Sequence, residues 1–446
     1  MRVTLLLVAV IALFAQADRP RMQRDVRTKH FSTALVCKSC HSNSADSGAM
    51  RDIQGRGIAP HDLWQSTSMA NSARDPFFRA LLAAESKVHG AKVEKGCLHC
   101  HAPMASYEAG EKGLAFAQLD DEFEEKDWDV AALARDGVSC TLCHQLTPEQ
   151  GSNGDFRINE DREIYGRFDK QFGVAMHRVS QYWPVQGMHV LDADQCRSCH
   201  ASSVAGEQTW YEWRNSKADR TCQDCHMPSD PTRTRIARAS HPGDIPNIIP
   251  RTPISKHTFV GGNTLLLRIL RDNIHDLKVK APRAAFDRTI AETRRMLQTM
   301  TARVSIEDAR PTTGALRVVV QVENLAGHKF PSGHASRRAW LRLRLREGKT
   351  PGGRILFAVG EHDARGRLLG AKGLHPAERP GAAFLPHFTT VRNADEVQIY
   401  QSVMKGSSIF VHASKGLVKD NRLLPDGWKA DHADAAKTRP IGIGED

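Results

Sequence analysis

The sequence predicts a mainly α fold with long loops over residues 18–262, followed by a small antiparallel β-sandwich-like domain over residues 303–446. Three observations lead to this division. One five-residue pattern recurs five times between residues 37 and 226, separated by stretches with little periodicity. Residues 263–302 then keep the apolar spacing of a helix, and beyond residue 303 apolar and polar residues alternate, as they do in strands.

The recurring pattern is C-x-x-C-H, and it uses all ten cysteines of the chain. Random placement of the cysteines and histidines would give roughly a hundredth of one such pattern, so five of them are not accidental. The cysteine pairs are Cys37 and Cys40, Cys97 and Cys100, Cys140 and Cys143, Cys196 and Cys199, and Cys222 and Cys225, followed by His41, His101, His144, His200 and His226. We number these motifs 1 to 5 in chain order.

This spacing is the one that covalent haem attachment requires. Two thiols three residues apart can form thioethers with the vinyl groups of a haem while the adjacent imidazole reaches the iron. Zinc knuckles work in pairs and need no histidine after the second cysteine, and disulfides explain neither the constant step nor the histidine. The motifs therefore predict five c-type haems, with the ten cysteines binding the cofactor, the five histidines ligating iron, and the helical part folded around stacked haems.

Composition and charge agree with this interpretation. Only 40% of the residues are hydrophobic, so we expect the apolar cofactors rather than side chains to form the interior of the first half. The formal net charge of +11 would suit a nucleic acid. However, the propionates of five haems add roughly ten negative charges, and arginine pairs well with carboxylates. We interpret the excess of basic residues as compensation for the negative charge of the haem propionates, and we expect no nucleic-acid partner.

Residues 1–17 have the pattern of a secretory signal peptide. Arg2 is followed by an apolar run at residues 3–14 and by an A-x-A site at residues 15–17. The run is shorter than the roughly 20 residues of a membrane span, so cleavage after Ala17 is favoured over an anchor. Because c-type haem is attached outside the bacterial cytoplasm, we expect a periplasmic or extracellular protein that does not span the membrane.

The segment after the motif region changes period twice. Residues 263–302 are expected to form a long helical segment that is broken at Pro282, because proline cannot continue a helix. Residues 316–322, 339–345 and 355–359 alternate apolar and polar side chains and predict antiparallel strands with one polar face.

The second axial ligand of each iron decides what a haem can do. A second histidine closes the iron and suits electron transfer, whereas an open position lets a substrate bind. The candidate second ligands are His257, His177, His189, His61 and His30. Met69 is a rival ligand, and a turn-rich loop at residues 327–334, with His328 and His334, either lies on the surface or reaches back to a haem.

Six further segments carry a resemblance. They are residues 61–71 (HDLWQSTSMAN), 75–79 (DPFFR), 137–144 (GVSCTLCH), 211–216 (YEWRNS), 222–228 (CQDCHMP) and 327–333 (GHKFPSG). Together they resemble the bacterial multihaem c-type cytochromes of the hydroxylamine-oxidoreductase and tetrahaem nitrifier-cytochrome superfamily, as a pentahaem member with a C-terminal β domain. The resemblance implies a helical, loop-rich fold around stacked haem pairs and a role in respiratory electron transfer. Ala70 departs from it, since related sequences tend to have a histidine there.

These observations predict an exported electron carrier rather than a catalyst. It would relay single electrons between respiratory redox partners, with a membrane quinol-linked donor or another cytochrome on one side. The alternative is a multihaem oxidoreductase with one open-site haem that acts on a small nitrogen or sulfur compound. A third interpretation is a binding module whose haems are structural and whose β domain docks a partner complex.

Overall fold

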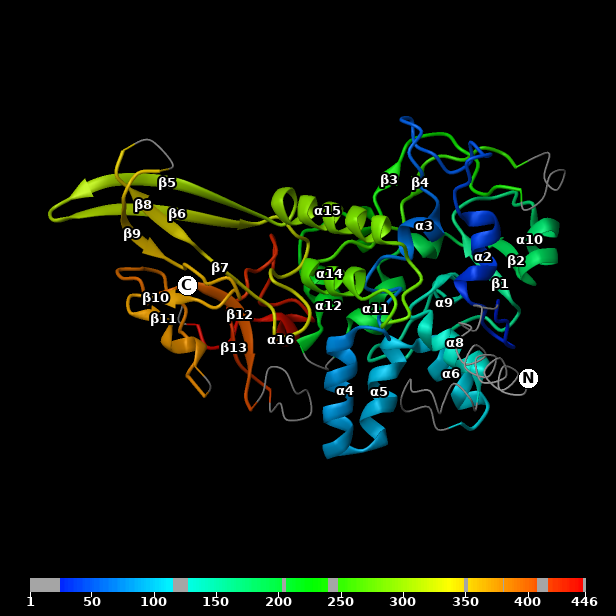
Figure 1. Ribbon diagram of the computed structural model, residues 1–446, viewed down its shortest axis with the longest axis horizontal. Helices are drawn as coiled ribbons and strands as arrows, with labels where there is room; N and C mark the ends of the chain where they lie inside the picture. The colour runs from blue at the N-terminus through cyan, green and yellow to red at the C-terminus, as the bar shows by residue number, and fades with distance from the viewer. Residues whose placement is uncertain are drawn as a thin grey trace, which may run out of the picture.

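The computed structural model describes residues 25–114, 127–202, 206–239, 248–348, 352–379, 381–406 and 416–443. The predicted signal peptide at residues 1–17 lies outside these ranges. The structure is 32% helical and 19% strand, so the prediction of a mainly α fold is wrong and the fold is mixed (Figure 1). The motif-bearing helices are short and give way to loops after one to three turns, which keeps the helical content low.

The first part of the described chain is built from helices. They are α2 (Ala34–His41), α3 (Pro60–Trp64), α4 (Pro76–His89), α5 (Ala91–His101), α6 (Pro103–Glu111), α8 (Trp128–Arg135) and α9 (Cys140–Cys143). Helix α4 begins at Pro76, after Asp75 whose side chain accepts hydrogen bonds from the backbone N–H groups of Phe77 and Phe78. Proline at the first helical position and an aspartate cap are standard helix starts.

An apolar core of side chains holds these helices together. It includes Phe78 of α4, Leu98 of α5, Met104 of α6 and Leu133 of α8, all buried. Residues 26–146 thus have an apolar side-chain core of their own, in a part of the chain where we expected the cofactors to form the interior. The helices that carry motifs 2 and 3 rest on this core.

Residues 146–262 alternate short elements with loops. They contain β1 (Glu163–Gly166), α10 (Gly173–Ser180), β2 (Trp183–Gln186), the 3-10 helix η1 (Met188–Leu191), α11 (Asp194–His200), α12 (Thr209–Arg214), α13 (Cys222–His226), β3 (Ser229–Asp230) and β4 (Ile254–Ser255). Strands β1 and β2 pair in parallel, and β3 and β4 pair antiparallel. Such short pairs fix the loops that surround the motifs without forming a layer of their own.

Two helices follow, α14 (Thr264–Asp272) and α15 (Arg283–Thr299), with Pro282 directly before α15. Their buried faces pack on each other through Leu267, Leu270, Phe286 and Ile290. Helix α15 also contacts α3, since Arg288 donates to the backbone oxygen of Asp62 at 2.9 Å. Among the described residues, none of the helices has the length and apolar character needed to cross a bilayer.

The last part of the chain is rich in strands. It contains β5 (Ala302–Thr312), β6 (Ala315–Asn324), β7 (Arg338–Trp340), β8 (Leu343–Arg346), β9 (Ile355–Val359), β10 (Leu369–Gly370), β11 (Gly373–Leu374), the 3-10 helix η3 (Pro376–Glu378), β12 (Ile399–Met404), β13 (Leu417–Asp420) and α16 (Ala435–Thr438). The predicted strand segments lie in β6, β7 with β8, and β9.

The predicted β-sandwich is wrong, because the described strands form small separate sheets. Strands β5 and β6 pair alone, β8 pairs with β9, and the order of the three-stranded sheet is β13-β12-β7. Val304 and Ile306 on β5 are 59% and 62% exposed, whereas a sandwich would bury one face of that ribbon. A small apolar cluster with Leu368 and Ile399 forms the local core instead.

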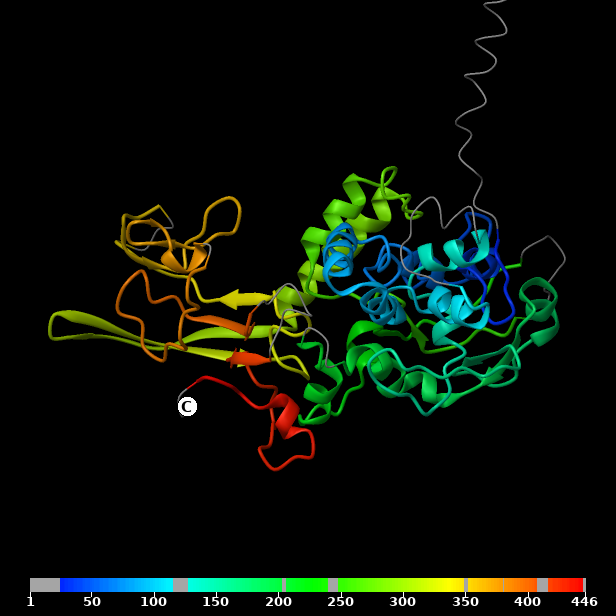
Figure 2. The same ribbon diagram turned by 90° about the horizontal axis from the view of Figure 1, so that it is seen from below.

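The molecule is elongated in both ribbon views. The β5–β6 ribbon and the small sheets lie at one end, the motif-bearing helices lie at the other, and α14 and α15 stand between them (Figures 1 and 2). The C-terminal helix α16 packs beside α12, so the end of the chain returns to the motif region.

Candidate haem sites

Each C-x-x-C-H motif lies at the end of its own short helix. Motifs 1 to 5 lie on α2, α5, α9, α11 and α13 in that order. A spacing of three residues puts both sulfurs of a motif on one side of the helix, about one turn apart. The histidine is the last helical residue or the residue that ends the helix, so its ring projects beyond the helix end.

The motifs form one contiguous cluster. The thiols of Cys37 and Cys140, of Cys100 and Cys199, and of Cys196 and Cys222 lie close together, so motifs 1 and 3, 2 and 4, and 4 and 5 are neighbours. Cys143 of motif 3 also lies near Cys199 of motif 4, which joins the two groups. None of the ten cysteines is in a disulfide, and all ten are partly buried.

Burial keeps some of these thiols neutral. It raises the pKa of the Cys143 thiol to about 12 and that of Cys97 to about 11. Because the thiolate is the nucleophilic form of cysteine, neither residue has the properties of a catalytic nucleophile.

The Nδ1 atom of every motif histidine faces a hydrogen-bond acceptor. In four of them the acceptor is a backbone oxygen. Nδ1 of His41 lies 3.0 Å from the oxygen of Ile236, and Nδ1 of His101 lies 3.2 Å from that of Ser72. Nδ1 of His144 lies 2.6 Å from the oxygen of Tyr165, and Nδ1 of His226 lies 2.7 Å from that of Val260. His200 differs, because its Nδ1 lies 3.4 Å from a carboxylate oxygen of Glu207. An imidazole that donates from Nδ1 keeps its lone pair on Nε2, so all five rings are set to bind a metal through Nε2.

His144 and His257 form a facing pair. Their ring centroids are 6.2 Å apart and their planes differ by 20°. The Nδ1 atom of His257 lies 3.0 Å from the backbone oxygen of Ser255, and burial, together with the nearby His144, lowers the pKa of His257 to about 3. An imidazole nitrogen binds a metal ion at about 2.0 Å, so two rings on opposite sides of one ion lie roughly 6 Å apart. The pair fits the two axial ligands of one haem iron.

His226 and His328 form a second facing pair. Their ring centroids are 6.5 Å apart and their planes differ by 10°. The Nδ1 atom of His328 faces the backbone oxygen of Lys329 at 2.8 Å. Burial, with a smaller effect of His328, lowers the pKa of His226 to about 4, so this imidazole is neutral and can act as a ligand.

His334 lies in the same loop, near His101 of motif 2. Its Nδ1 atom accepts a hydrogen bond from the Ser336 N–H at 3.2 Å and lies 2.9 Å from the Ser336 hydroxyl oxygen, so it differs from the Nδ1 atoms that face backbone oxygens. Its buried Nε2 has no hydrogen-bond partner among the described residues. Burial lowers the pKa of His101 to about 4, and the nearby His334 lowers it further. The loop at residues 327–334 therefore lies beside the histidines of motifs 2 and 5. The prediction that it reaches a haem stays a prediction.

His61 lies near His41 of motif 1. It is only 5% exposed, and its Nδ1 lies 3.4 Å from a carboxylate oxygen of Asp62. Burial lowers the pKa of His41, and the nearby His144 and His61 add to this effect. The sequence-predicted residues His257 and His61 thus lie beside motif histidines.

The structure places the other sequence-predicted ligands against different protein groups. Nε2 of His189 lies 2.9 Å from the backbone oxygen of Leu146. The His177 ring stacks on Trp183 at a centroid distance of 4.2 Å. His30 is 3% exposed, and its Nδ1 lies 3.3 Å from a carboxylate oxygen of Glu108.

The rival ligand Met69 packs against the apolar core of the first part of the chain. Sequence reasoning did not include His328 and His334 among the preferred second ligands. The sequence feature that points to them is the GHKFPSGH loop, which carries both histidines.

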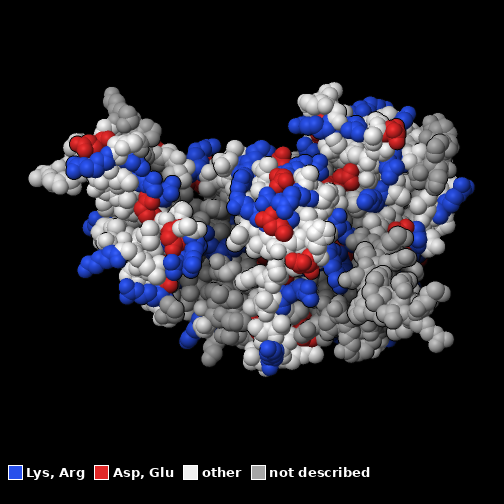
Figure 3. All heavy atoms as spheres, in the orientation of Figure 1, with Lys and Arg blue, Asp and Glu red and all other residues white. Residues whose placement is uncertain are grey.

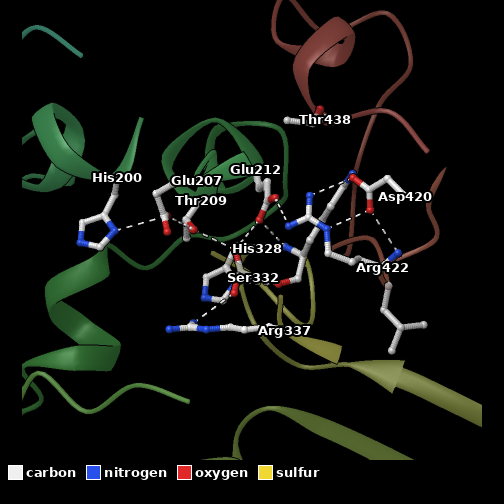
Figure 4. A network of polar contacts seen from close by, with 12 residues as sticks. His200, Glu207, Thr209, Glu212, His328, Ser332, Arg337, Asp420, Arg422 and Thr438 are labelled. Atoms are coloured by element: carbon white, nitrogen blue, oxygen red, sulfur yellow. Dashed lines mark hydrogen bonds and ion pairs between the residues drawn. The ribbon is translucent and has the colours of Figure 1, made fainter. Parts of the chain in front are cut away.

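A polar network holds this loop against motif 4 (Figure 4). From His200 and Glu207 it continues through Thr209, whose hydroxyl lies 2.8 Å from that of Ser332. Ser332 donates to Glu212 at 2.7 Å. The network thereby connects α11 and α12 to the loop that carries His328 and His334.

Buried charges complete the network on the far side of the loop. Glu212 pairs with Arg422 at 2.9 Å, and Asp420 accepts hydrogen bonds from Arg422 at 2.8 Å and from the Lys329 ammonium at 2.7 Å. All four side chains are at most 5% exposed. Such groups are stable in the interior only while every member keeps its partners.

A single glycine allows the loop to approach motif 4. Gly333 has a φ of +83°, and a Cβ atom there would lie 3.0 Å from both Arg337 Nη1 and Glu207 Oε2. A residue with a side chain would be strained in this conformation and would crowd Glu207.

Glu207 gives His200 an environment unlike that of the other motif histidines. Although burial alone would lower it, the hydrogen bond and charge of Glu207 raise the pKa of His200 to about 9. A carboxylate partner at Nδ1 makes a ligating imidazole more basic than a carbonyl partner does. Without a metal, His200 therefore carries a proton at neutral pH, whereas burial lowers the pKa of the other four motif histidines.

Zinc coordination gains no support from this geometry. Within the described ranges, no three histidine, cysteine, aspartate or glutamate side chains converge on one point, as a structural zinc site would require. A haem iron needs only two axial ligands from the protein, and the two facing histidine pairs meet that need. Comparison of the chain with family models, with curated proteins and with solved structures found no match.

Proposed function

We propose that this chain binds five c-type haems covalently and relays single electrons through them. The ten motif cysteines would hold the porphyrins, and His41, His101, His144, His200 and His226 would be the first axial ligands. The observation that carries the proposal is the pair of facing imidazoles, His144 with His257 and His226 with His328. When bound, c-type haem supplies a one-electron iron couple.

The residues around the motifs favour electron transfer over substrate binding. His257 and His328 would close two iron positions, and the location of His61 and His334 suits the same role at motifs 1 and 2. Two axial histidines leave no position for a substrate. The thiol contacts between motifs keep neighbouring attachment points adjacent, so the electron steps between them would be short.

We further propose export to the periplasm or beyond, with redox proteins as partners. The donor would be a membrane quinol-linked protein or another cytochrome, and the support is the N-terminal sequence pattern together with the motifs. On the face shown in Figure 3, lysine and arginine side chains are spread over both ends of the molecule and are interleaved with acidic ones. Such a mixed surface suits transient protein partners better than a continuous phosphate backbone.

One observation favours a second candidate, an oxidoreductase in which the haem at motif 4 is open to a small nitrogen or sulfur compound. His200 alone among the motif histidines faces a carboxylate, and a more basic axial ligand pushes electron density toward the iron. The two candidates differ in the spin state they require at motif 4.

The experiment is to count the haems and then sort their ligands. Intact mass and the pyridine haemochrome assay on the purified protein should give five haems per chain, and a variant with Cys196→Ala and Cys199→Ala should give four. Electron paramagnetic resonance should show low-spin ferric signals for an electron carrier. A high-spin ferric component, together with carbon monoxide binding to the reduced protein, would favour the oxidoreductase, and a colourless protein would refute both.

A further inference from the structure

A cavity lies beside motifs 1 and 3. Its empty space is about 430 Å³, part of it open to solvent, and its lining includes Lys38 of α2, His61 and Trp64 of α3, Arg74, Asp136 and Lys280. Ala34, Trp64 and Ala70, which also line it, pack with Cys140 of motif 3. The cavity thus adjoins two predicted haem attachment points.

Arg74 is a buried cation whose terminal nitrogens have no protein partner. The residue is 4% exposed, and its Nε donates to the backbone oxygen of Arg135 at 2.8 Å, which fixes the guanidinium. Its Nη1 and Nη2 are buried and have no hydrogen-bond partner among the described residues. A buried guanidinium without partners is costly, so an acceptor of opposite charge is expected at this position.

The charge of Asp136 stabilises the Arg74 guanidinium, but no described residue accepts a hydrogen bond from Nη1 or Nη2. Asp136, which is 1% exposed, already accepts hydrogen bonds from the Ala34 N–H at 2.7 Å and the Ser139 hydroxyl at 2.5 Å on one oxygen. Its other oxygen accepts from Lys280 at 3.0 Å. With Lys38 exposed beside the cavity, the lining has an excess of positive charge.

We propose that this cavity is a carboxylate-binding site in which Nη1 and Nη2 of Arg74 hold the two oxygens of one carboxylate. The guanidinium fork matches a carboxylate and forms two parallel hydrogen bonds with it. The carboxylate is either a propionate of the haem at motif 1 or motif 3, which rests on the proposed function, or a free organic acid from the solution.

The test compares Arg74→Leu and Arg74→Lys with Arg354→Leu, which removes the same charge from an exposed ion pair with Glu347. Each holoprotein is titrated with a reductant to obtain its midpoint potentials, and with acetate in a calorimeter. Haem content and far-UV circular dichroism are measured first, so that a protein without haem is recognised as a failure of the proposed function.

If a haem propionate occupies the cavity, Arg74→Leu should lower one or two midpoint potentials by about 59 mV. For a one-electron couple this corresponds to a tenfold change in the redox equilibrium constant. Removing a positive charge favours the oxidised iron, and Arg74→Lys should shift the same midpoints less. In that case acetate should bind neither the wild type nor any of the variants. If the ligand is a free acid, acetate should bind the wild type saturably and Arg74→Leu at least tenfold more weakly, without a change in the midpoints.

The proposal is wrong if Arg74→Leu matches Arg354→Leu in both titrations. If Arg74→Leu does not fold, Arg74→Lys decides, because lysine keeps the charge but lacks the fork. Wild-type midpoints and wild-type acetate binding in the folded lysine variant would equally overturn the proposal.

Discussion

The imidazole rings of His144 and His257 face each other at 6.2 Å, although the two residues are far apart in the chain. His144 ends motif 3, and His257 comes from the connector that leads to α14. Both rings turn their Nδ1 atoms toward backbone oxygens, which leaves the Nε2 lone pair of each ring available to a ligand.

Replacing His257 by alanine should open one iron to a sixth ligand from outside. We expect the loss of about one fifth of the low-spin ferric signal and the appearance of high-spin iron, because one axial nitrogen is removed. Electron paramagnetic resonance of the oxidised holoprotein measures this. His177→Ala is the matched control, since the His177 ring stacks on Trp183, and an unchanged spectrum for His257→Ala would contradict the pairing.

The loop histidines should act at two different irons. We expect His328→Ala and His334→Ala each to convert one haem to high spin and the double variant to convert two, because His328 faces His226 and His334 lies near His101. Carbon monoxide binding to the reduced variants counts the open sites. His362→Ala is the control, because that Nδ1 bonds the backbone oxygen of Asp363 within the C-terminal part. Equal counts in the single and double variants would place both residues at one iron.

Glu212→Gln should destabilise the holoprotein strongly. The variant leaves Arg422 with a weaker buried partner, and breaking a buried ion pair costs about 3–5 kcal/mol. Unfolding by denaturant, followed by circular dichroism, measures the change. Glu347→Gln removes an exposed ion pair with Arg354 and should cost at most about 1 kcal/mol. Similar values for the two variants would show that the network does not stabilise the fold.

Asp420 should make the stability depend on pH. Burial alone would raise the pKa of this carboxyl, but the hydrogen bonds and charges of Arg422 and Lys329 outweigh burial and lower it. Its contribution is therefore complete above the unfolded pKa of about 3.9 and is lost as the pH falls through the lower folded pKa. The difference in free energy of unfolding between the wild type and Asp420→Asn should be constant near neutral pH and shrink below about pH 4. A difference that is independent of pH would refute this assignment.

The motif residues can be recognised from the sequence more readily than the proposed second ligands can. A C-x-x-C-H pattern is local, so Cys140, Cys143 and His144 can be recognised without a fold. A second ligand depends on tertiary contacts. Proximity along the chain favoured His177 and His189, but the structure engages their rings with Trp183 and with the backbone oxygen of Leu146.

The C-terminal fold shows the same limit. Alternation of apolar and polar residues located strand segments such as β6 and β9, because that signal is local. Alternation cannot say which strands share a sheet, and the sandwich expected from it does not form. The buried charges of Lys329 and Asp420 show no periodicity, yet they fix the loop that carries His328.

The charged groups behind the loop make the motif region depend on the end of the described chain. The carboxylate of Glu212 in α12 has its guanidinium partner in Arg422, which follows β13. A chain that lacks residues 417–443 would keep every cysteine and all the motif histidines, but Glu212 would be left without Arg422.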